Sequence, residues 1–493
     1  MTCMKRLLPV FSLLAFIALA ACKPGVESET GAVDATDRHV FSERAWPVPE
    51  TVVIVMIDTL RADILGAYGS ARGLTPHLDA FANQAVVFAN AYGSSSWTRS
   101  SVASMLSGRY PTSHTALGKL DILPDEVLLL PEILESNAPT WSFGITTNAN
   151  TSAGIGFGQG YDHYGPVLGA EKRRYPQDQI GLVPGEAVSG HALELFKDER
   201  QAGVDTTFAF IQYIDPHDPY FPNPEFMPGP VPDGEYSGSR RDIDAMVAAG
   251  KKARTQNNIA RLRYLYDGEV AYNDHAFGEL IDGLKRMGLY DEALIIVVSD
   301  HGEAFWEHGK RGHGKSLYEE EIRVPFMIKL PGMEPPSTLR IEQAVSVVDI
   351  TPTILDAMKI VPSEEIEGRS LLPLINGLAR EERLEYVFAE LHFFENKSVT
   401  TIRHDTLKLL ATYWHKRKAN KVVLELFDLE GDPLETSNLI DDNNYAHARN
   451  ELVGALSAWE SDVLDWALDS QRVKLEDMDD EIVDELKGLG YIK

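Results

Sequence analysis

Three long apolar runs constrain the fold of this 493-residue chain more than any other feature of its sequence. The runs are TVVIVMID at 51–58, TFAFIQYIDPHDPY at 207–220 and ALIIVVSDHGE at 293–303. Because their apolar residues do not alternate with polar ones, each is typical of a strand buried on both faces, as in parallel sheets. Apolar residues at helical spacing lie between the runs, most clearly over 259–287. The sequence therefore predicts an α/β fold with a doubly wound, mainly parallel sheet.

Each predicted strand ends in a carboxylate. Asp58, Asp215 and Asp300 stand at these ends, and His217 and His301 follow within two residues. In open α/β sheets, ligands bind beyond the carboxyl ends of the strands. Carboxylate oxygens with an imidazole suit Ca²⁺, Mg²⁺, Mn²⁺ or Zn²⁺, and the residue types do not choose among these ions. The strand ends thus predict a divalent metal site, whereas a single Asp in such a place is usually a cap or turn residue.

The segment SSSWTRSSVASMLSGRYP at 94–111 predicts a helix that begins near Thr98. Apolar residues follow Thr98 at helical spacing, and Gly108 is a helix stop. Taken by itself, Thr98 would simply be the N-cap residue of this helix.

The first 22 residues have the pattern of an export signal. Lys5 and Arg6 precede an apolar run that ends in small residues and Cys22. This ending is similar to the lipobox of bacterial lipoproteins, so we expect residues 1–22 to be a lipoprotein signal peptide and Cys22 to carry lipid. A plain transmembrane anchor is the alternative, but the run is short for one. We therefore expect an exported periplasmic or outer-membrane lipoprotein, or one at the cell surface, anchored to the membrane by its lipid.

The rest of the chain divides by composition. Residues 23–50 are polar and acidic, which predicts a flexible tether. We expect 51–385 to be the catalytic domain, 386–445 a smaller antiparallel β subdomain containing a strand pair, and 446–493 a helical segment whose amphipathic end docks back. The net charge of −28 argues against a nucleic-acid partner, and an anionic substrate would need a local positive site such as a metal.

Several motifs occur in a fixed order over roughly 51–380: VIVMIDTLRAD, WTRSSVASMLSGRYP, YIDPHDPY and VVSDHGEAFWEHGKRGHGKSLYEEEIRVPF. This ordered set resembles the sulfatase family within the alkaline phosphatase superfamily, and LFDLEGDPLETSNL further on resembles its C-terminal subdomain. The resemblance implies the doubly wound fold and an active-site metal. It implies metal ligation by Asp58, Thr98, Asp300 and His301, catalytic roles at the leaving group for His217 and His313, and substrate binding by Asn148 and Lys315.

The nucleophile departs from the family pattern. Sulfatases use a Cys or Ser that is oxidised to formylglycine, in a Cys/Ser-x-Pro-x-Arg signature nine residues before the Thr or Ser of LTG or LSG. Counting back from Ser107 gives Thr98, and Val102 stands where the Arg belongs. Thr cannot give this aldehyde, and Ser95 and Ser96 do not keep the spacing. No formylglycine is therefore expected.

An unmodified Thr98 would form an ordinary ester that water then hydrolyses, which suits phosphoryl transfer. We therefore expect a metal-dependent hydrolase that acts on a phosphoester, phosphodiester or phosphonate, or transfers such a group. The substrate would be an anionic ester, either small or linked to a glycan or lipid. Two alternatives are a sulfuric ester hydrolase that works without formylglycine and a non-catalytic lipoprotein that binds a glycan or a partner.

Overall fold

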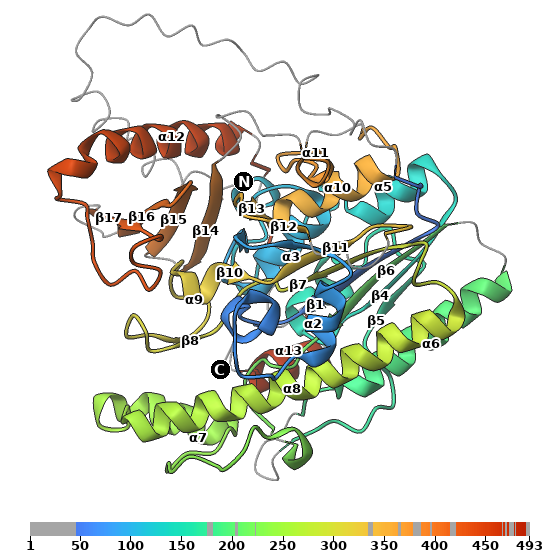
Figure 1. Ribbon diagram of the computed structural model, residues 1–493, viewed down its shortest axis with the longest axis horizontal. Coiled ribbons are helices and arrows are strands. Elements are labelled where there is room, and N and C mark those ends of the chain that lie inside the picture. The colour runs from blue at the N-terminus through green and yellow to red at the C-terminus, as the bar shows by residue number, and fades with distance from the viewer. Residues whose placement is uncertain are drawn as a thin grey trace, which may run out of the picture.

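The centre of the molecule is an eight-stranded sheet (Figure 1). The computed structural model describes residues 46–174, 181–202, 206–221, 223–333, 339–362, 366–377, 386–394, 397–414, 421–465, 467–468, 471–472, 478 and 480–489. The predicted apolar runs form three adjacent strands. β1 (Thr51–Ile57) pairs in parallel with β6 (Thr206–Tyr213) on one side and with β7 (Ala293–Val298) on the other.

The full strand order is β12-β2-β11-β7-β1-β6-β4-β5. β11 runs antiparallel to both of its neighbours, and the other pairings in this sheet are parallel. The outer strands are β2 (Val86–Phe88), β4 (Thr140–Ile145), β5 (His163–Gly165), β11 (Phe326–Lys329) and β12 (Leu339–Ile341). The predicted mainly parallel α/β sheet is confirmed.

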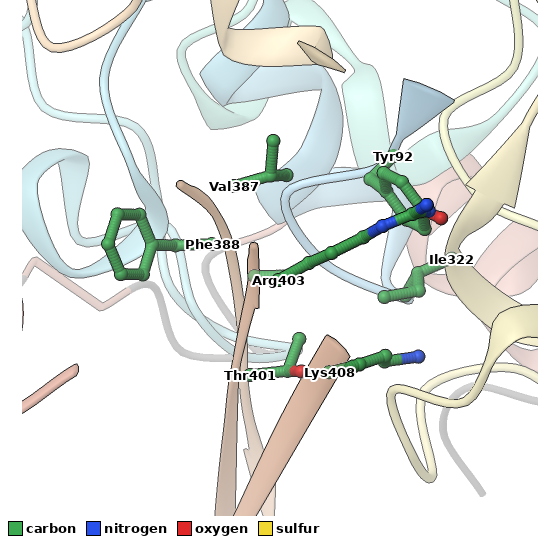
Figure 2. A pocket seen from close by; sticks show the side chains of 8 residues that line it. Tyr92, Ile322, Val387, Phe388, Thr401, Arg403 and Lys408 are labelled. Carbon is green, nitrogen blue, oxygen red and sulfur yellow. The ribbon is translucent and has the colours of Figure 1, made fainter. Parts of the chain in front are cut away.

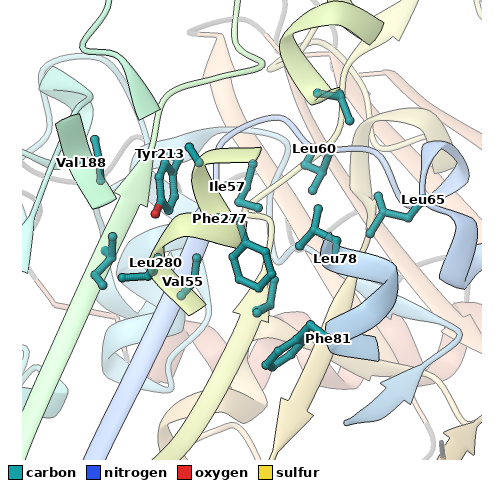
Figure 3. Close-up of a cluster of buried hydrophobic side chains, with 14 of the residues drawn as sticks. Val55, Ile57, Leu60, Leu65, Leu78, Phe81, Val188, Tyr213, Phe277 and Leu280 are labelled. Atoms are coloured by element: carbon teal, nitrogen blue, oxygen red, sulfur yellow. The ribbon is translucent and has the colours of Figure 1, made fainter. Parts of the chain in front are cut away.

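Helices cover both faces of this sheet, which explains why its central strands are apolar throughout. Odd-numbered residues of β1 belong to one core and even-numbered residues to the other. The first face carries α2 (Pro76–Ala82), α6 (Gly185–Ala202) and α8 (Gln256–Met287), and Figure 3 shows Val55 and Ile57 beside Phe277 of α8. The second face carries α3 (Thr98–Ser107), α5 (Leu130–Asn137) and α10 (Ile350–Ala357). Each fully buried aliphatic or Phe side chain contributes about 1.5–3 kcal/mol.

A separate antiparallel sheet follows in the C-terminal part. Its strands are β14 (Val387–Phe394), β15 (Lys397–His404), β16 (Leu407–Trp414) and β17 (Lys421–Asp428), in that order. The prediction of a strand pair was too simple, because Asp405 adopts a left-handed conformation (φ 53°) that turns one predicted strand into the hairpin of β15 and β16. α12 (Ala446–Asp465) packs on one face of this sheet.

A small cavity lies where this second sheet meets the main body (Figure 2). Tyr92 and Ile322 line it from the main body, and Arg403 lies over the Tyr92 ring, 4.9 Å from the ring centroid. Its volume of about 10 Å³ is close to the space that one water molecule needs, so it cannot hold an organic substrate.

The C-terminal helix α13 (Asp480–Gly488) returns to the main body as predicted (Figure 1). Leu486 and Leu489 are buried in a cluster that includes Trp97 and Ala149. At the other end, Trp46 lies within the expected tether but donates a hydrogen bond to Asn376 (3.1 Å). The predicted signal peptide, Cys22 and tether residues 23–45 lie outside the described residues. None of the described helices is long and apolar enough to span a membrane.

Candidate active site

The carboxyl ends of β1 and β7 bring Asp58, Asp300 and His301 together. One possible ligand atom from each residue lies within 4.8 Å of the others. All three side chains are completely buried. Because β1 and β7 are parallel neighbours, their ends meet at the same edge of the sheet.

The backbone around Asp300 is held on two sides. Its carbonyl oxygen accepts a hydrogen bond from Ser101 Oγ (2.7 Å), which ties it to α3. On another side lies Gly93, where a Cβ atom would stand only 2.3 Å from the same oxygen. The Asp300 Oδ1 atom accepts from the backbone N–H groups of Thr59 (3.2 Å) and His301 (2.9 Å). The position of this carboxylate is therefore set by three separate segments.

Within this cluster, two buried carboxylate oxygens have no hydrogen-bond partner among the described residues: Asp58 Oδ1 and Asp300 Oδ2. Burial and the charge of Asp300 together raise the pKa of Asp58 well above its ordinary value. Two buried carboxylates this close need a positive charge between them to remain ionised. The two oxygens therefore fit a divalent cation, and they stand beside an imidazole that could complete the ligand set.

The tautomer of His301 suits metal ligation. Its Nδ1 lies 2.9 Å from the Gly302 carbonyl oxygen, which can only accept, so Nδ1 carries the proton. The Nε2 lone pair then faces the centre of the site, 3.3 Å from Asp300 Oδ2. A backbone carbonyl that fixes the far nitrogen in this way is usual for metal-bound histidines.

Thr98 lies at the start of α3 with its hydroxyl turned into the site. Its Oγ1 is 3.1 Å from His301 Nε2, and the side chain is completely buried. The expected N-cap role is wrong: Trp97 occupies the N-cap position with extended backbone, and Thr98 is the first helical residue. The hydroxyl is therefore not used for capping, and the positive N-terminal end of α3 lies next to it.

Asn148 follows β4 and contacts the acidic cluster directly. Its Nδ2 donates a hydrogen bond to Asp58 Oδ2 (2.8 Å), while its Oδ1 accepts from the backbone of Asn150 (3.0 Å). Of the Asp58 carboxylate, Oδ2 is thus occupied and Oδ1 is left for another partner.

His217 and His313 lie beside the cluster. The ring centroid of His313 lies 4.4 Å from that of His301 and 4.9 Å from that of His217. His217 donates from Nδ1 to the Asp218 carbonyl, and His313 donates from Nδ1 to Glu303 Oε2 (2.9 Å). Burial and His313 lower the pKa of His217 to about 3, and burial and His301 lower that of His313 well below its ordinary value. Both rings are therefore neutral near pH 7.

Lys315 comes close to the same group of side chains. Its ammonium group donates to the Arg311 carbonyl and lies 3.3 Å from the place where a Cβ on Gly312 would stand. Burial and Arg311 lower the pKa of Lys315. The structure thus brings Lys315 to the side of the pocket that holds Glu303 and His313.

A buried ion pair behind His217 was not found from the sequence. Asp218 bonds to the guanidinium groups of Arg240 and Arg311. Burial would raise the pKa of Asp218, but these two cations hold it well below its ordinary value. The DPHDP motif shows Asp218 but not its partners, which come from distant parts of the chain.

Asp215 does not join the metal cluster, although it also stands at a strand end. It lies 3.5 Å from Arg173, which also pairs with Glu269. The chain after β6 therefore brings His217 to the site and directs Asp215 elsewhere.

A family model described as sulfatase matches residues 50–360, well over half of the chain. The chain belongs to the sulfatase family. A second model, described as the C-terminal part of N-sulphoglucosamine sulphohydrolase, matches residues 307–462. Members of this family hydrolyse esters. The family predicted from the order of the motifs is confirmed.

Two curated relatives resemble this sulfatase-family chain over most of their length. An ulvan-active sulfatase from Formosa agariphila is 26% identical and covers 83% of this chain and 81% of the relative. A choline-sulfatase from Rhizobium meliloti is 27% identical, and the match covers 79% of this chain and 82% of the relative.

Among solved structures, a phosphonate monoester hydrolase of Agrobacterium radiobacter superposes with a TM-score of 0.68 at 20% identity, covering 87% of this chain and 99% of that one. A 2-O GAG sulfatase also superposes with a TM-score of 0.68 at 20% identity, covering 86% of this chain and 95% of that one. These likenesses show the fold, and the fold does not choose between sulfur and phosphorus esters.

Proposed function

We propose that this protein is a metal-dependent hydrolase of phosphorus esters, either phosphoester, phosphodiester or phosphonate, in which Thr98 is the nucleophile. One observation supports this most strongly: the buried Thr98 hydroxyl faces His301 Nε2 at 3.1 Å, beside the carboxylates of Asp58 and Asp300. The phosphonate monoester hydrolase of Agrobacterium radiobacter, which shares this fold, is compatible with this substrate class. Transfer of the same group to another acceptor would use the same residues.

The chemistry of the threonine favours phosphorus over sulfur. A formylglycine hydrate can expel a bound sulfate by collapsing to its carbonyl, and a threonine ester has no such route. Water must therefore attack the ester of Thr98 directly. A phosphorus centre accepts in-line attack by water when its oxygens are held by positive groups.

In this mechanism, Asp58, Asp300 and His301 would hold a divalent metal, which lowers the pKa of a hydroxyl and offsets charge on the transferring oxygens. The neutral ring of His217 or His313 would accept the proton of Thr98 Oγ1, which forms a bond to phosphorus while the bond to the leaving oxygen breaks. Asn148 keeps Asp58 oriented through its hydrogen bond to Oδ2.

His217 and His313 would move the protons at the leaving group. They are neutral in the structure, but an anionic ester beside them raises their pKa, so one ring can carry the proton that the leaving oxygen receives. The same ring then accepts a proton from the water that hydrolyses the ester of Thr98. Lys315 would bind an oxygen of the substrate.

The test compares an aryl phosphate, a bis-aryl phosphate, an aryl phosphonate ester and an aryl sulfate with the wild-type protein and its Thr98→Ala and Thr98→Ser variants. We expect a phosphorus ester to give the highest kcat/KM. Thr98→Ala should lose roughly 10³-fold or more, as for other removed nucleophiles, while Thr98→Ser keeps a hydroxyl and retains most activity. Sulfate preferred above every phosphorus ester, or full activity in Thr98→Ala, would overturn the proposal.

The second candidate is a sulfuric ester hydrolase without formylglycine. The two curated relatives named as sulfatases favour it, because each covers about four fifths of this chain. The same assay separates the two candidates, and the intact mass of the protein would reveal any aldehyde at residue 98.

We also propose that residues 1–22 direct export and that Cys22 is lipidated, on the evidence of the charged start, apolar run and small-residue ending. Metabolic labelling with a fatty acid should mark the wild-type protein and leave Cys22→Ser unlabelled. Equal labelling of both proteins would contradict this.

A further inference from the structure

Two lysine ammonium groups converge on one carbonyl oxygen beside the active site. The Nζ atoms of Lys310 and Lys397 each lie 3.0 Å from the carbonyl oxygen of Lys315. Lys310 belongs to the hairpin between β8 (Ala304–Phe305) and β9 (Arg311–Gly312), whereas Lys397 begins β15 of the C-terminal sheet. Positive charges from the two parts of the fold are thus brought within a few ångströms of each other.

Neither ammonium group has a carboxylate within 4.0 Å among the described residues, although the chain holds 74 acidic residues. The two nearby acids have other partners. Glu321 accepts hydrogen bonds from the backbone N–H groups of Lys315 and Ser316, both at 3.2 Å. Glu425 accepts one from the hydroxyl of Tyr318 (3.2 Å). Neither lysine of the pair therefore forms an ion pair with these two acids among the described residues.

Aromatic rings help to hold the two ammonium groups in place. Lys310 Nζ lies 5.9 Å from the ring centroid of Tyr318, and Lys397 Nζ lies 5.7 Å from that of Trp414. Burial and the neighbouring Lys310 lower the pKa of Lys397 to about 8. An anion between the two groups would remove this repulsion, so the arrangement favours an anionic ligand.

The lysine pair is near the reacting hydroxyl. Ser96 Oγ donates a hydrogen bond to the Ser316 carbonyl (2.7 Å), and Ser96 precedes Thr98 by two residues. With 3.8 Å between consecutive Cα atoms, the ammonium groups lie on the order of 10 Å from the Thr98 hydroxyl. The Lys315 side chain turns to the catalytic side, while its carbonyl faces the lysine pair.

We propose that Lys310 and Lys397 form a subsite for a second anionic group of the substrate, a carboxylate, sulfate or phosphate about 10 Å from the ester that is cleaved. This inference rests on the proposed ester hydrolysis and adds a substrate class to it. The organic part of the substrate then carries its own negative charge, as in an acidic or multiply esterified glycan.

Binding to the Thr98→Ala protein tests this subsite without turnover. The probes are a disaccharide that carries two sulfate groups and its monosulfated counterpart, titrated by calorimetry into the metal-loaded protein. We expect the disulfated probe to bind about tenfold more tightly or better, which corresponds to ~1.4 kcal/mol. Adding Lys310→Gln and Lys397→Gln should bring the two affinities within about twofold, because charge-assisted bonds are lost.

Two further proteins make the result specific. Lys397→Arg keeps the charge and should keep most of the preference. Lys285→Gln removes an exposed charge in the last turn of α8, at the opposite edge of the sheet, and should keep all of it. The inference is overturned if the parent shows no preference, if the double Gln variant keeps it, or if Lys285→Gln loses it equally.

The binding result is independent of the nucleophile. If Thr98→Ala still hydrolyses an aryl ester, the proposed nucleophile is wrong, yet the preference between the two probes can still be measured. Raising the ionic strength should weaken that preference, because salt screens the lysine pair.

Discussion

Replacing Gly93 by alanine should disturb the candidate active site without touching any reacting atom. A Cβ at this position would stand 2.3 Å from the carbonyl oxygen of Asp300, and real Cβ contacts are longer than 3.0 Å. The backbone at residue 93 and the backbone at Asp300 must therefore move apart by about 0.7 Å. Ser101 holds the same carbonyl from the α3 side, so Asp300 cannot shift freely. Misplacement of a catalytic group by about 1 Å costs roughly 10²-fold in rate, and overpacking costs roughly 1–3 kcal/mol of stability.

The assay measures kcat/KM on the best aryl ester, bound metal by mass spectrometry and the free energy of unfolding in urea. We expect Gly93→Ala to lose roughly 10²-fold in kcat/KM and part of its metal. Gly190→Ala is the control, because Gly190 lies in α6 with nothing within 4 Å of the added Cβ. The free energy of unfolding of this control should rise by about 0.4–1 kcal/mol, and its activity should not change. Wild-type activity and metal content in Gly93→Ala would refute the reasoning.

Three further outcomes are expected. Removing divalent metal with a chelator should abolish most activity and lower the melting temperature, and adding metal should restore both; full activity without metal would exclude the proposed ligand set. Burial alone would raise the pKa of Asp218, but Arg240 and Arg311 hold this pKa below its value in the unfolded chain. The ionised Asp218 therefore stabilises the fold above about pH 4, and this stabilisation is lost as the pH falls further. Asp218→Asn should therefore cost roughly 3–5 kcal/mol in urea unfolding at pH 7 and less at pH 3, and an equal cost at both would contradict this. Leu486→Ala should lower the free energy of unfolding by roughly 2–5 kcal/mol, because Leu486 is buried in the cluster that includes Trp97, and an unchanged unfolding midpoint would show that α13 does not contribute.

The sequence was sufficient for the three central strands β1, β6 and β7, because these strands are apolar on both faces. Asp58 and Asp300 follow two such strands, and parallel pairing alone brings their side chains to one edge. The start of α3 was also predicted to within one residue, although Thr98 proved to be the first helical residue and Trp97 the N-cap.

Side-chain direction beyond the strand ends could not be predicted in the same way. Asp215 also ends a strand, but it turns towards Arg173, which lies 42 positions earlier in a segment without a clear pattern. The pairing of Lys397 with Lys310 likewise depends on how the second sheet docks. Such contacts depend on loop geometry and tertiary packing, which periodicity does not encode.

The order of strands in the sheet also has a consequence for how this protein matures. Asp58 follows the first strand and Asp300 follows the seventh, so the cluster needs two segments 242 positions apart in the chain. A nascent or truncated chain that ends before β7 contains the threonine and one acid but cannot present the set. The chain would then acquire the cation only after β7 has paired with β1, and no product of synthesis that ends before β7 would carry the reactive set.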